Sequence, residues 1–277
     1  MSYDLPPELT VGLDGAVRVV TINRPAAHNA VDAPLHNALT VVWQQLAADP
    51  DARAVVITGA GKAFSAGGDL EQLEAFAHDP VAREESLSEG VRLIDEMLQF
   101  PLPVIAAVNG PAVGLGCSLA VLCDIVLISD RAYLCDPHVS VGLAAGDGGA
   151  AFWPLLGPLL RSREYLFTGE RIPAERAVDL GLASRVVPHD ELHSEALDLG
   201  YRLAVLSPQA LQGTKRVLNS YLARAMQGAV QDGIDAERTT MTSDEFRERV
   251  AEMRASQGST SEGSSSEGSA SQGPTLS

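Results

Sequence analysis

The sequence has few cysteines and no long hydrophobic run. Its three cysteines, Cys117, Cys123 and Cys135, are odd in number and lack C-x-x-C spacing, which disfavours a disulfide framework and a zinc site. All three lie in apolar stretches, and this favours buried, unreactive thiols. No apolar run reaches the ~18 residues of a membrane span, and the first residues resemble no secretory leader. The sequence therefore predicts a cytoplasmic protein without a membrane partner.

Basic residues are scarce relative to acidic ones. Lys and Arg number 20 against 36 Asp and Glu, which gives a net charge of −16 and a pI near 4.7. A chain this acidic repels nucleic acid and anionic lipid surfaces, so neither is expected as a partner. The 277 residues are 45% hydrophobic, enough for one large core with a helical appendage.

In the first half of the chain, apolar runs alternate with amphipathic segments. Strands are expected at residues 17–22, 54–58, 104–108 and 125–128. Helices are expected from the N-cap Asp32 to about Asp49, then at residues 84–99 and 114–122. Strands that alternate with helices form β-α-β units, so the sequence predicts an α/β fold with a mainly parallel sheet.

From about Gly157 the pattern becomes helical. Helices are expected from Pro173 onward and at residues 190–206, 208–224 and 228–251. Residues 255–277 are mostly Ser, Gly, Glu and Gln with almost nothing to bury, and we expect them to be disordered. The chain thus divides into a core (1–205), a helical region (206–254) and a tail (255–277).

Two glycine-rich turns each lead from an expected strand toward a helix. Residues 65–69 read S-A-G-G-D and residues 110–116 read G-P-A-V-G-L-G. The first N–H groups of a helix have no intrahelical partner, and glycine lets a ligand approach them closely. Two such amides on one oxygen form an oxyanion hole, in which one donor contributes about 2.7–4 kcal/mol. Ordinary tight turns explain the same residues equally well, and Asp69 is expected to cap the following helix.

Neither turn matches a nucleotide-binding motif. Ala63 follows Gly61-Lys62 where a P-loop requires Ser or Thr, and Phe64 stands where a dinucleotide fingerprint requires its third glycine. An NAD-dependent oxidoreductase is therefore disfavoured.

Several motifs, in order, resemble the crotonase (enoyl-CoA hydratase/isomerase) superfamily. They are N-R-P and N-A within residues 23–30, F-S-A-G-G-D-L at 64–70, I-A-A-V-N-G-P-A-V-G-L-G-C at 105–117, L-F-T-G at 166–169 and A-V-D-L-G-L-A at 177–183. The resemblance covers roughly residues 10–250. It implies a spiral of stacked β-β-α units, a trimerisation role for residues 206–254, and hence a homotrimer or hexamer.

The resemblance also implies an acyl-CoA thioester substrate, with coenzyme A as part of the substrate, no bound cofactor and no metal. Ala66 and Leu115 match the family's oxyanion-hole positions; many members have glycine where this chain has Leu115. The positions expected to border the CoA and acyl chain are Ala26, Ala27, Ala30, Gly67, Gly68, Asp69, Leu70 and Gly114.

This chain departs from the family's hydratases at both of their catalytic glutamates. The first position holds Ser118, and the second, after Asp136-Pro137, holds His138. Serine is not a base at its ordinary pKa, and one imidazole cannot reproduce a pair of carboxylates. Hydration by the usual family mechanism is therefore not expected.

Other titratable groups are candidates for catalysis. Asp147, in the glycine-rich loop 142–149, is either a turn residue or a catalytic carboxylate; its position resembles the nucleophile of aromatic-acyl-CoA dehalogenases and an acid of β-diketone hydrolases. His138 is either structural or catalytic. His36 is either a half-exposed helix residue or a functional one, because its position resembles a histidine of the β-diketone hydrolases. Ser118 either packs in its helix or donates a hydrogen bond. The three catalytic candidates are Asp147, His138 and Ser118.

The sequence predicts an enzyme that stabilises a thioester enolate, with Asp147 and His138 moving protons or attacking the substrate. Isomerisation, non-standard hydration and C–C bond hydrolysis of the cyclic β-diketone type remain open. A non-catalytic acyl-CoA binding protein is the alternative, because both glutamates are missing. A Ser118–His138–Asp147 triad has the right residue types, but spacing along the chain does not establish mutual distance.

Overall fold

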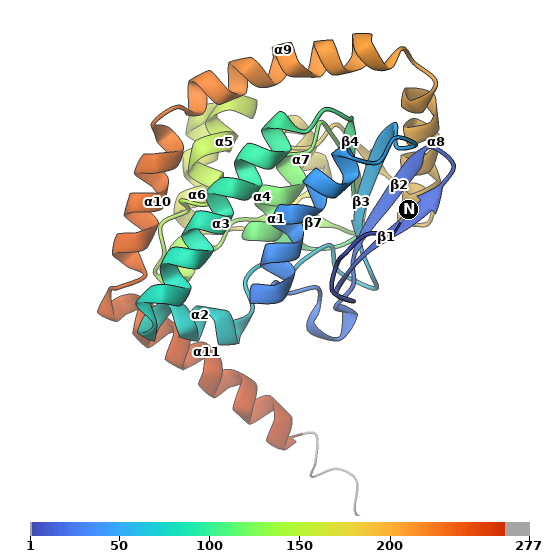
Figure 1. Ribbon diagram of the computed structural model, residues 1–277. Helices are drawn as coiled ribbons and strands as arrows, with labels where there is room; N and C mark the ends of the chain where they lie inside the picture. Colours follow the sequence, from blue (N-terminus) through green and yellow to red (C-terminus); the bar gives the residue numbers. More distant parts are fainter. Residues whose placement is uncertain (1, 264–277) are drawn as a thin grey trace, which may run out of the picture.

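A six-stranded sheet forms the centre of the protein in a computed structural model, which describes residues 2–263 (Figure 1). The strand order is β1-β2-β3-β4-β6-β9, and all neighbours are parallel except β1 and β2. The strands are β1 (Leu9–Asp14), β2 (Val17–Ile22), β3 (Ala54–Gly59), β4 (Val104–Val108), β6 (Ile125–Ser129) and β9 (Arg185–Val187). The expected mainly parallel sheet is confirmed.

A smaller sheet accompanies the first, in the order β5-β7-β8. Its strands are β5 (Ala112–Val113), β7 (Tyr133–Cys135) and β8 (Ile172–Pro173). The chain passes from β4 to β5 and then α4, and from β6 to β7 and then a helical turn. An isolated bridge from Ser65 to Ala112 adds the turn after β3 to the same edge. This alternation between two sheets is the β-β-α spiral that the family resemblance implies.

Side-chain caps fix where the early helices begin. These helices are η1 (Pro25–Ala27), α1 (Ala33–Ala47), α2 (Leu70–His78), α3 (Pro80–Gln99) and α4 (Leu115–Val121). Asp32 caps α1, and Asp69 accepts from the Glu71 amide at 3.0 Å to cap α2, as expected. The helix expected at residues 84–99 begins earlier, at Pro80, because the Asp79 carboxylate accepts from the Val81 amide at 2.8 Å.

The second half of the chain contains strands that the sequence pattern did not reveal. Strands β8 and β9 lie there, each only two or three residues long, too short to produce a recognisable period. The helices are η2 (His138–Val141), α5 (Gly149–Leu156), α6 (Leu159–Thr168), α7 (Ala174–Asp179), η3 (His189–Glu191) and α8 (Leu192–Ala204). The helical pattern expected from about Gly157 is therefore interrupted by these two strands, which is a correction to the sequence analysis.

Three C-terminal helices enclose one side of the molecule: α9 (Pro208–Met226), α10 (Ala229–Thr240) and α11 (Asp244–Gly263) (Figure 1). Helix α10 packs against α3 and α5, and α11 packs against α2. Helix α11 runs through Gly263, so the disorder expected from residue 255 does not describe residues 255–263; residues 264–277 lie outside the described part. No helix in residues 2–263 is both long and apolar enough to cross a membrane.

The sheet is covered on both faces. On one face Val56 and Ile105 pack against Ala196 of α8. The other face belongs to the main core, which includes Leu39 and Trp43 of α1. The three cysteines are buried and unpaired, as expected. A third, separate apolar cluster joins α2, α3, α10 and α11, and it surrounds the cavity described below.

The backbones of the two glycine-rich turns touch. A Cβ atom placed on Gly110 would lie 2.0 Å from the Lys62 carbonyl oxygen, so no side chain fits. We expect Gly110→Ala to lower the free energy of unfolding by about 1–3 kcal/mol through overpacking, measured by urea denaturation.

Gly213→Ala is the matched control, because no atom lies within 4 Å of a Cβ placed there in α9. Its stability should stay the same or rise by up to ~1 kcal/mol, since alanine favours a helix. Equal stability of the Gly110→Ala variant and the wild type would contradict the close contact.

Candidate functional site

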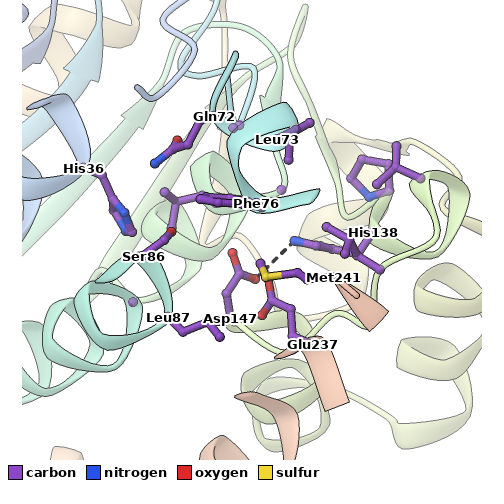
Figure 2. A pocket seen from close by; sticks show the side chains of 18 of the residues that line it. His36, Gln72, Leu73, Phe76, Ser86, Leu87, His138, Asp147, Glu237 and Met241 are labelled. Carbon is purple, nitrogen blue, oxygen red and sulfur yellow. Dashed lines mark ion pairs between the residues drawn. The ribbon is translucent and has the colours of Figure 1, made fainter. Parts of the chain in front are cut away.

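A cavity of about 240 Å³ lies between the two glycine-rich turns and the C-terminal helices (Figure 2). Much of its wall is apolar and comes from α2, α3, α10 and α11, and the side chains in this part include Leu73, Phe76, Leu87, Ile234, Met241 and Met253. Such a wall suits a hydrocarbon chain. The polar part of the wall contains two histidines and two carboxyl groups, and their arrangement determines the chemistry that the cavity can support.

The structure divides the residues singled out from the sequence into two groups. The cavity is lined by Ala66, Gly67, Gly68, Gly114, Leu115, His36, His138 and Asp147. The residues outside its wall are Ala26, Ala27, Ala30, Asp69, Leu70 and Ser118. Asp69 has partners outside the cavity: it caps α2, and its carboxylate lies 3.0 Å from the Arg24 guanidinium.

The two amides predicted for the oxyanion hole differ in their hydrogen bonding. The Leu115 amide, at the first position of α4, has no acceptor within residues 2–263. The Ala66 amide donates to the His28 carbonyl oxygen at 3.0 Å. His28 and Asn29 both have positive φ angles, and the Asn29 side chain donates to the Ala63 carbonyl, which fixes this loop. Of the two amides, only that of Leu115 is therefore without an acceptor within residues 2–263, and the oxyanion hole stays a prediction.

Ser118 is buried away from the cavity. Its Oγ has no hydrogen-bond partner in the described chain, and a Cβ atom placed on Gly148 would lie 2.4 Å from it. Ser118 therefore packs beneath the start of α5. No hydrogen bond joins Ser118 to His138 or Asp147 in the described chain, so the triad considered from the sequence is not formed.

His138 lies between two aspartates. Its Nδ1 is 2.5 Å from Asp136 Oδ1, and its Nε2 is 3.5 Å from Asp147 Oδ1 (Figure 2). Burial alone lowers the pKa of His138, but attraction to Asp136 and Asp147 and the hydrogen bond from Nδ1 outweigh burial and raise the pKa well above 6.5. This shift favours the imidazolium form of His138, and each of its two ring nitrogens faces one of the two aspartates.

Glu237 is a member of this group that the sequence analysis missed. It lies on α10, lines the cavity and is 4% exposed. Ligand-type atoms of His138, Asp147 and Glu237 all lie within 4.8 Å of one another, a spacing that could also hold a cation. One signal was present: Glu237 follows Ile234 by three residues and precedes Met241 by four, which places an acid on the apolar face of a helix.

Burial raises the pKa values of both carboxyl groups in the cavity wall. Desolvation is the largest cause for Asp147, and the nearby His138 charge partly opposes it. Desolvation, together with the Asp147 charge, raises the pKa of Glu237 to about 8. The two acids are close and both are poorly solvated, so they resist carrying two negative charges at once.

Close contact between two glycines brings Glu237 to Asp147. A Cβ atom on Gly146 would lie 2.2 Å from the Gly233 carbonyl oxygen, and one on Gly233 would lie 2.8 Å from the Gly146 carbonyl oxygen. The loop that carries Asp147 therefore rests directly on the α10 backbone. Glu237 is one helical turn after Gly233, so it faces the same loop.

His36 occupies another part of the cavity wall. Its Nδ1 is 3.1 Å from Glu89 Oε2, and its Nε2 is buried without a hydrogen-bond partner in the described chain. The cavity thus contains two histidines, and the Nδ1 of each faces a carboxylate.

Comparisons with known proteins agree with this architecture. The family model described as enoyl-CoA hydratase/isomerase matches residues 12–256. The 2,3-dehydroadipyl-CoA hydratase of Escherichia coli is 36% identical over 237 residues, which are 85% of this chain and 89% of the relative. The short-chain-enoyl-CoA hydratase of Clostridium acetobutylicum is 34% identical over 207 residues, 74% of this chain and 78% of the relative. A crystal structure of an enoyl-CoA hydratase/isomerase from Mycobacterium paratuberculosis superimposes with a TM-score of 0.87 at 48% identity, covering 90% of this chain and all of that one.

The Asp136–His138 contact predicts how the imidazole titrates. We expect Asp136→Asn to lower the His138 pKa, because burial then opposes the imidazolium with less compensation. The measurement is an NMR titration of the histidine ring signals, assigned with a His138→Gln variant.

A linked effect on stability follows from the same contact. A raised folded-state pKa stabilises the protein fully below the unfolded-state value, about 6.5, and this stabilisation is lost as the pH rises through the folded value. In Asp136→Asn the folded-state pKa of His138 should be lower, so this variant should lose less stability as the pH rises over this range. An unchanged His138 pKa in the variant would contradict the role of Asp136.

Proposed function

This chain belongs to the enoyl-CoA hydratase/isomerase family, and on that premise we propose that it forms the enolate of an acyl-CoA thioester beside the His138–Asp147 pair. One observation carries the proposal. The uncommitted Leu115 amide and the Asp147 carboxyl group line the same cavity, so a hydrogen-bond donor for a thioester oxygen and a base for a nearby carbon face the same space.

The thioester oxygen accepts a hydrogen bond from the Leu115 amide. The Ala66 amide becomes the second donor when that oxygen replaces the His28 carbonyl, its acceptor in this structure. Ala66 and Gly68 are exposed at the edge of the cavity, so the CoA moiety extends outward past them. Ala26, Ala27, Ala30, Asp69 and Leu70 would then border the CoA rather than the acyl group.

Asp147 takes the proton from Cα, and His138 stabilises the ionised form of Asp147 through its Nε2–H. Asp136 holds His138 in the cationic form that this requires. The apolar part of the wall encloses the acyl chain. The two relatives are hydratases of 2,3-dehydroadipyl-CoA and of short-chain enoyl-CoA, and we extend this class of unsaturated acyl-CoA substrates to this chain.

Helix α9 supports the proposal of a homotrimer or hexamer. Its apolar side chains Val217, Leu218 and Tyr221 are 55%, 60% and 68% exposed. Apolar side chains that are exposed together commonly mark a contact with another subunit.

His36 favours a second candidate, hydrolysis of a C–C bond in an acyl group with a cyclic β-diketone. His36 lines the cavity, and its unpartnered Nε2 could donate to a ketone oxygen remote from the thioester. A ring-opened carboxylic acid as product would identify this reaction, whereas a hydrated or isomerised acyl-CoA would identify the first.

The proposal is tested by deuterium incorporation. Wild-type protein in D₂O should place deuterium at Cα of saturated straight-chain acyl-CoA thioesters, detected by mass spectrometry. Asp147→Asn should lower the rate about 10²–10⁴-fold, because the base is lost.

Asp79→Asn is the matched control, because Asp79 caps α3 and lies outside the cavity wall. Its exchange rate should remain that of the wild type. Tight binding of acyl-CoA without exchange by the wild type would instead favour a non-catalytic binding protein.

A backbone substitution tests the oxyanion donor. Leu115→Pro removes the N–H and replaces the leucine side chain at the first position of α4, where proline is tolerated. We expect it to lower the exchange rate about 10²–10³-fold. Leu115→Ala keeps the amide and should retain most of the rate; equal losses in the two variants would mean that the side chain, rather than the amide, matters.

A further inference from the structure

Hydration of an enoyl-CoA requires two proton transfers. One proton is exchanged with Cα, and the other is exchanged with the water oxygen that bonds to Cβ. Asp147 can serve one of these positions. Ser118 and His138 occupy the positions of the family's glutamates, and Ser118 lies outside the cavity wall, so a second carboxyl group has to come from elsewhere in the fold.

Glu237 has the placement that such a group needs. Its side chain lines the cavity, and its Oε2 is buried with no hydrogen-bond partner in the described chain. Figure 2 shows the Asp147 and Glu237 side chains converging below the His138 ring. A buried polar atom without a partner costs about 1–3 kcal/mol, so an unpartnered carboxyl oxygen on a side chain of the cavity wall would gain from a polar group that a ligand brings.

Ion pairing does not explain the buried position of Glu237. No ion pair joins it to a Lys or Arg within residues 2–263. The neighbouring Arg238 is engaged by Glu84 of α3 and by Asp235, both outside the cavity wall. The anchoring of α10 to α3 therefore does not use the Glu237 carboxyl group.

We infer that Glu237 is the second catalytic carboxyl group, sharing one proton with Asp147 so that the two acids replace the missing glutamate pair. This rests on the proposed function, because it assumes that Asp147 serves Cα of a thioester held at the Leu115 amide. The C-terminal helical region then contributes a reacting group to the site.

In the dehydration direction, the two acids remove water from a 3-hydroxyacyl-CoA. Asp147 carboxylate takes the Cα proton, and the C–H electron pair moves into the thioester to give the enolate. The enolate electrons then form the Cα=Cβ bond as the Cβ–O bond breaks, and the Glu237 proton joins the leaving hydroxyl to give water. One proton passes from Asp147 to Glu237 to restore the pair, and hydration runs the same steps in reverse.

The charges around Glu237 fit a starting state in which Asp147 is ionised and Glu237 is protonated. A pKa of about 8 keeps Glu237 protonated at neutral pH. The charged groups that act on it are Asp147, His138 and Asp136. Glu84 of α3 is paired with Arg238. Helix α5 also packs on α10 but has no titratable side chain.

The test compares two reactions in the same variants. Hydration of straight-chain trans-2-enoyl-CoA needs both acids, whereas Cα deuterium exchange on the matching saturated acyl-CoA needs only Asp147. Glu237→Gln should lower hydration about 10²–10⁴-fold and leave exchange within about threefold of wild type. Asp147→Asn should lower both, and Glu237→Asp should recover part of the hydration rate.

A pH profile provides a readout that a structural role would not change. The dehydration rate of the wild type should fall as the pH rises through about 8, because Glu237 then loses the proton that it donates. Glu237→Gln should lack this descending limb.

Glu84→Gln is the control for loosening of α10. It removes the partner of Arg238, the residue that follows Glu237, without touching the cavity. Hydration and exchange should both stay near wild type in this variant.

The inference would be overturned by equal loss of hydration and exchange in Glu237→Gln or by wild-type hydration in that variant. Loss of wild-type hydration on treatment with a metal chelator would also overturn it, because the three side chains would then be assigned to a cation. Wild-type exchange without any hydration would also contradict it. Absence of exchange in the wild type would instead remove the proposed function itself.

Discussion

Buried charge is the constraint on which the rest of the site depends. Asp136, Asp147 and Glu237 place carboxyl groups around one imidazole, largely out of contact with water. An uncompensated buried charge is expensive, so the group has to approach neutrality internally. The short contact between Asp136 and His138 provides one balanced pair. Asp147 and Glu237 are left with pKa values raised by desolvation, a condition under which carboxyl groups exchange protons near neutral pH.

Backbone contacts between glycines create this environment. The Gly146–Gly233 contact lets the loop of Asp147 rest directly on α10, and Gly148 and Gly149 bring the start of α5 against Ser118 and Asp136. Any side chain at these positions would push the elements apart and open the cluster to water. The small residues of this loop therefore act on the chemistry indirectly, by keeping the carboxyl groups close together and poorly solvated.

The C-terminal helices complete the cavity. Ile234, Met241 and Met253 from α10 and α11 form apolar wall opposite the glycine-rich turns. If Glu237 acts as we infer, the same helices supply both the enclosure and a reacting carboxyl group. The pair of acids would then come from a loop and a remote helix.

The sequence by itself determined the features that depend on local patterns. Buried apolar runs identified strands β3 and β4, Asp32 and Asp69 were recognised as helix caps, and the ordered motifs identified the fold. Asp147 and His138 were also recognised as candidates from the sequence, and the structure places them together at the cavity.

Only the tertiary structure decided which remote groups meet. In the folded chain the Ala66 amide donates to the His28 carbonyl, and Ser118 packs beneath Gly148. Glu237 lies beside His138 and Asp147 in the site. The physical reason is that a local pattern encodes backbone conformation and the side that is buried. Hydrogen-bond partners and shared protons depend instead on how elements far apart in the chain pack against each other.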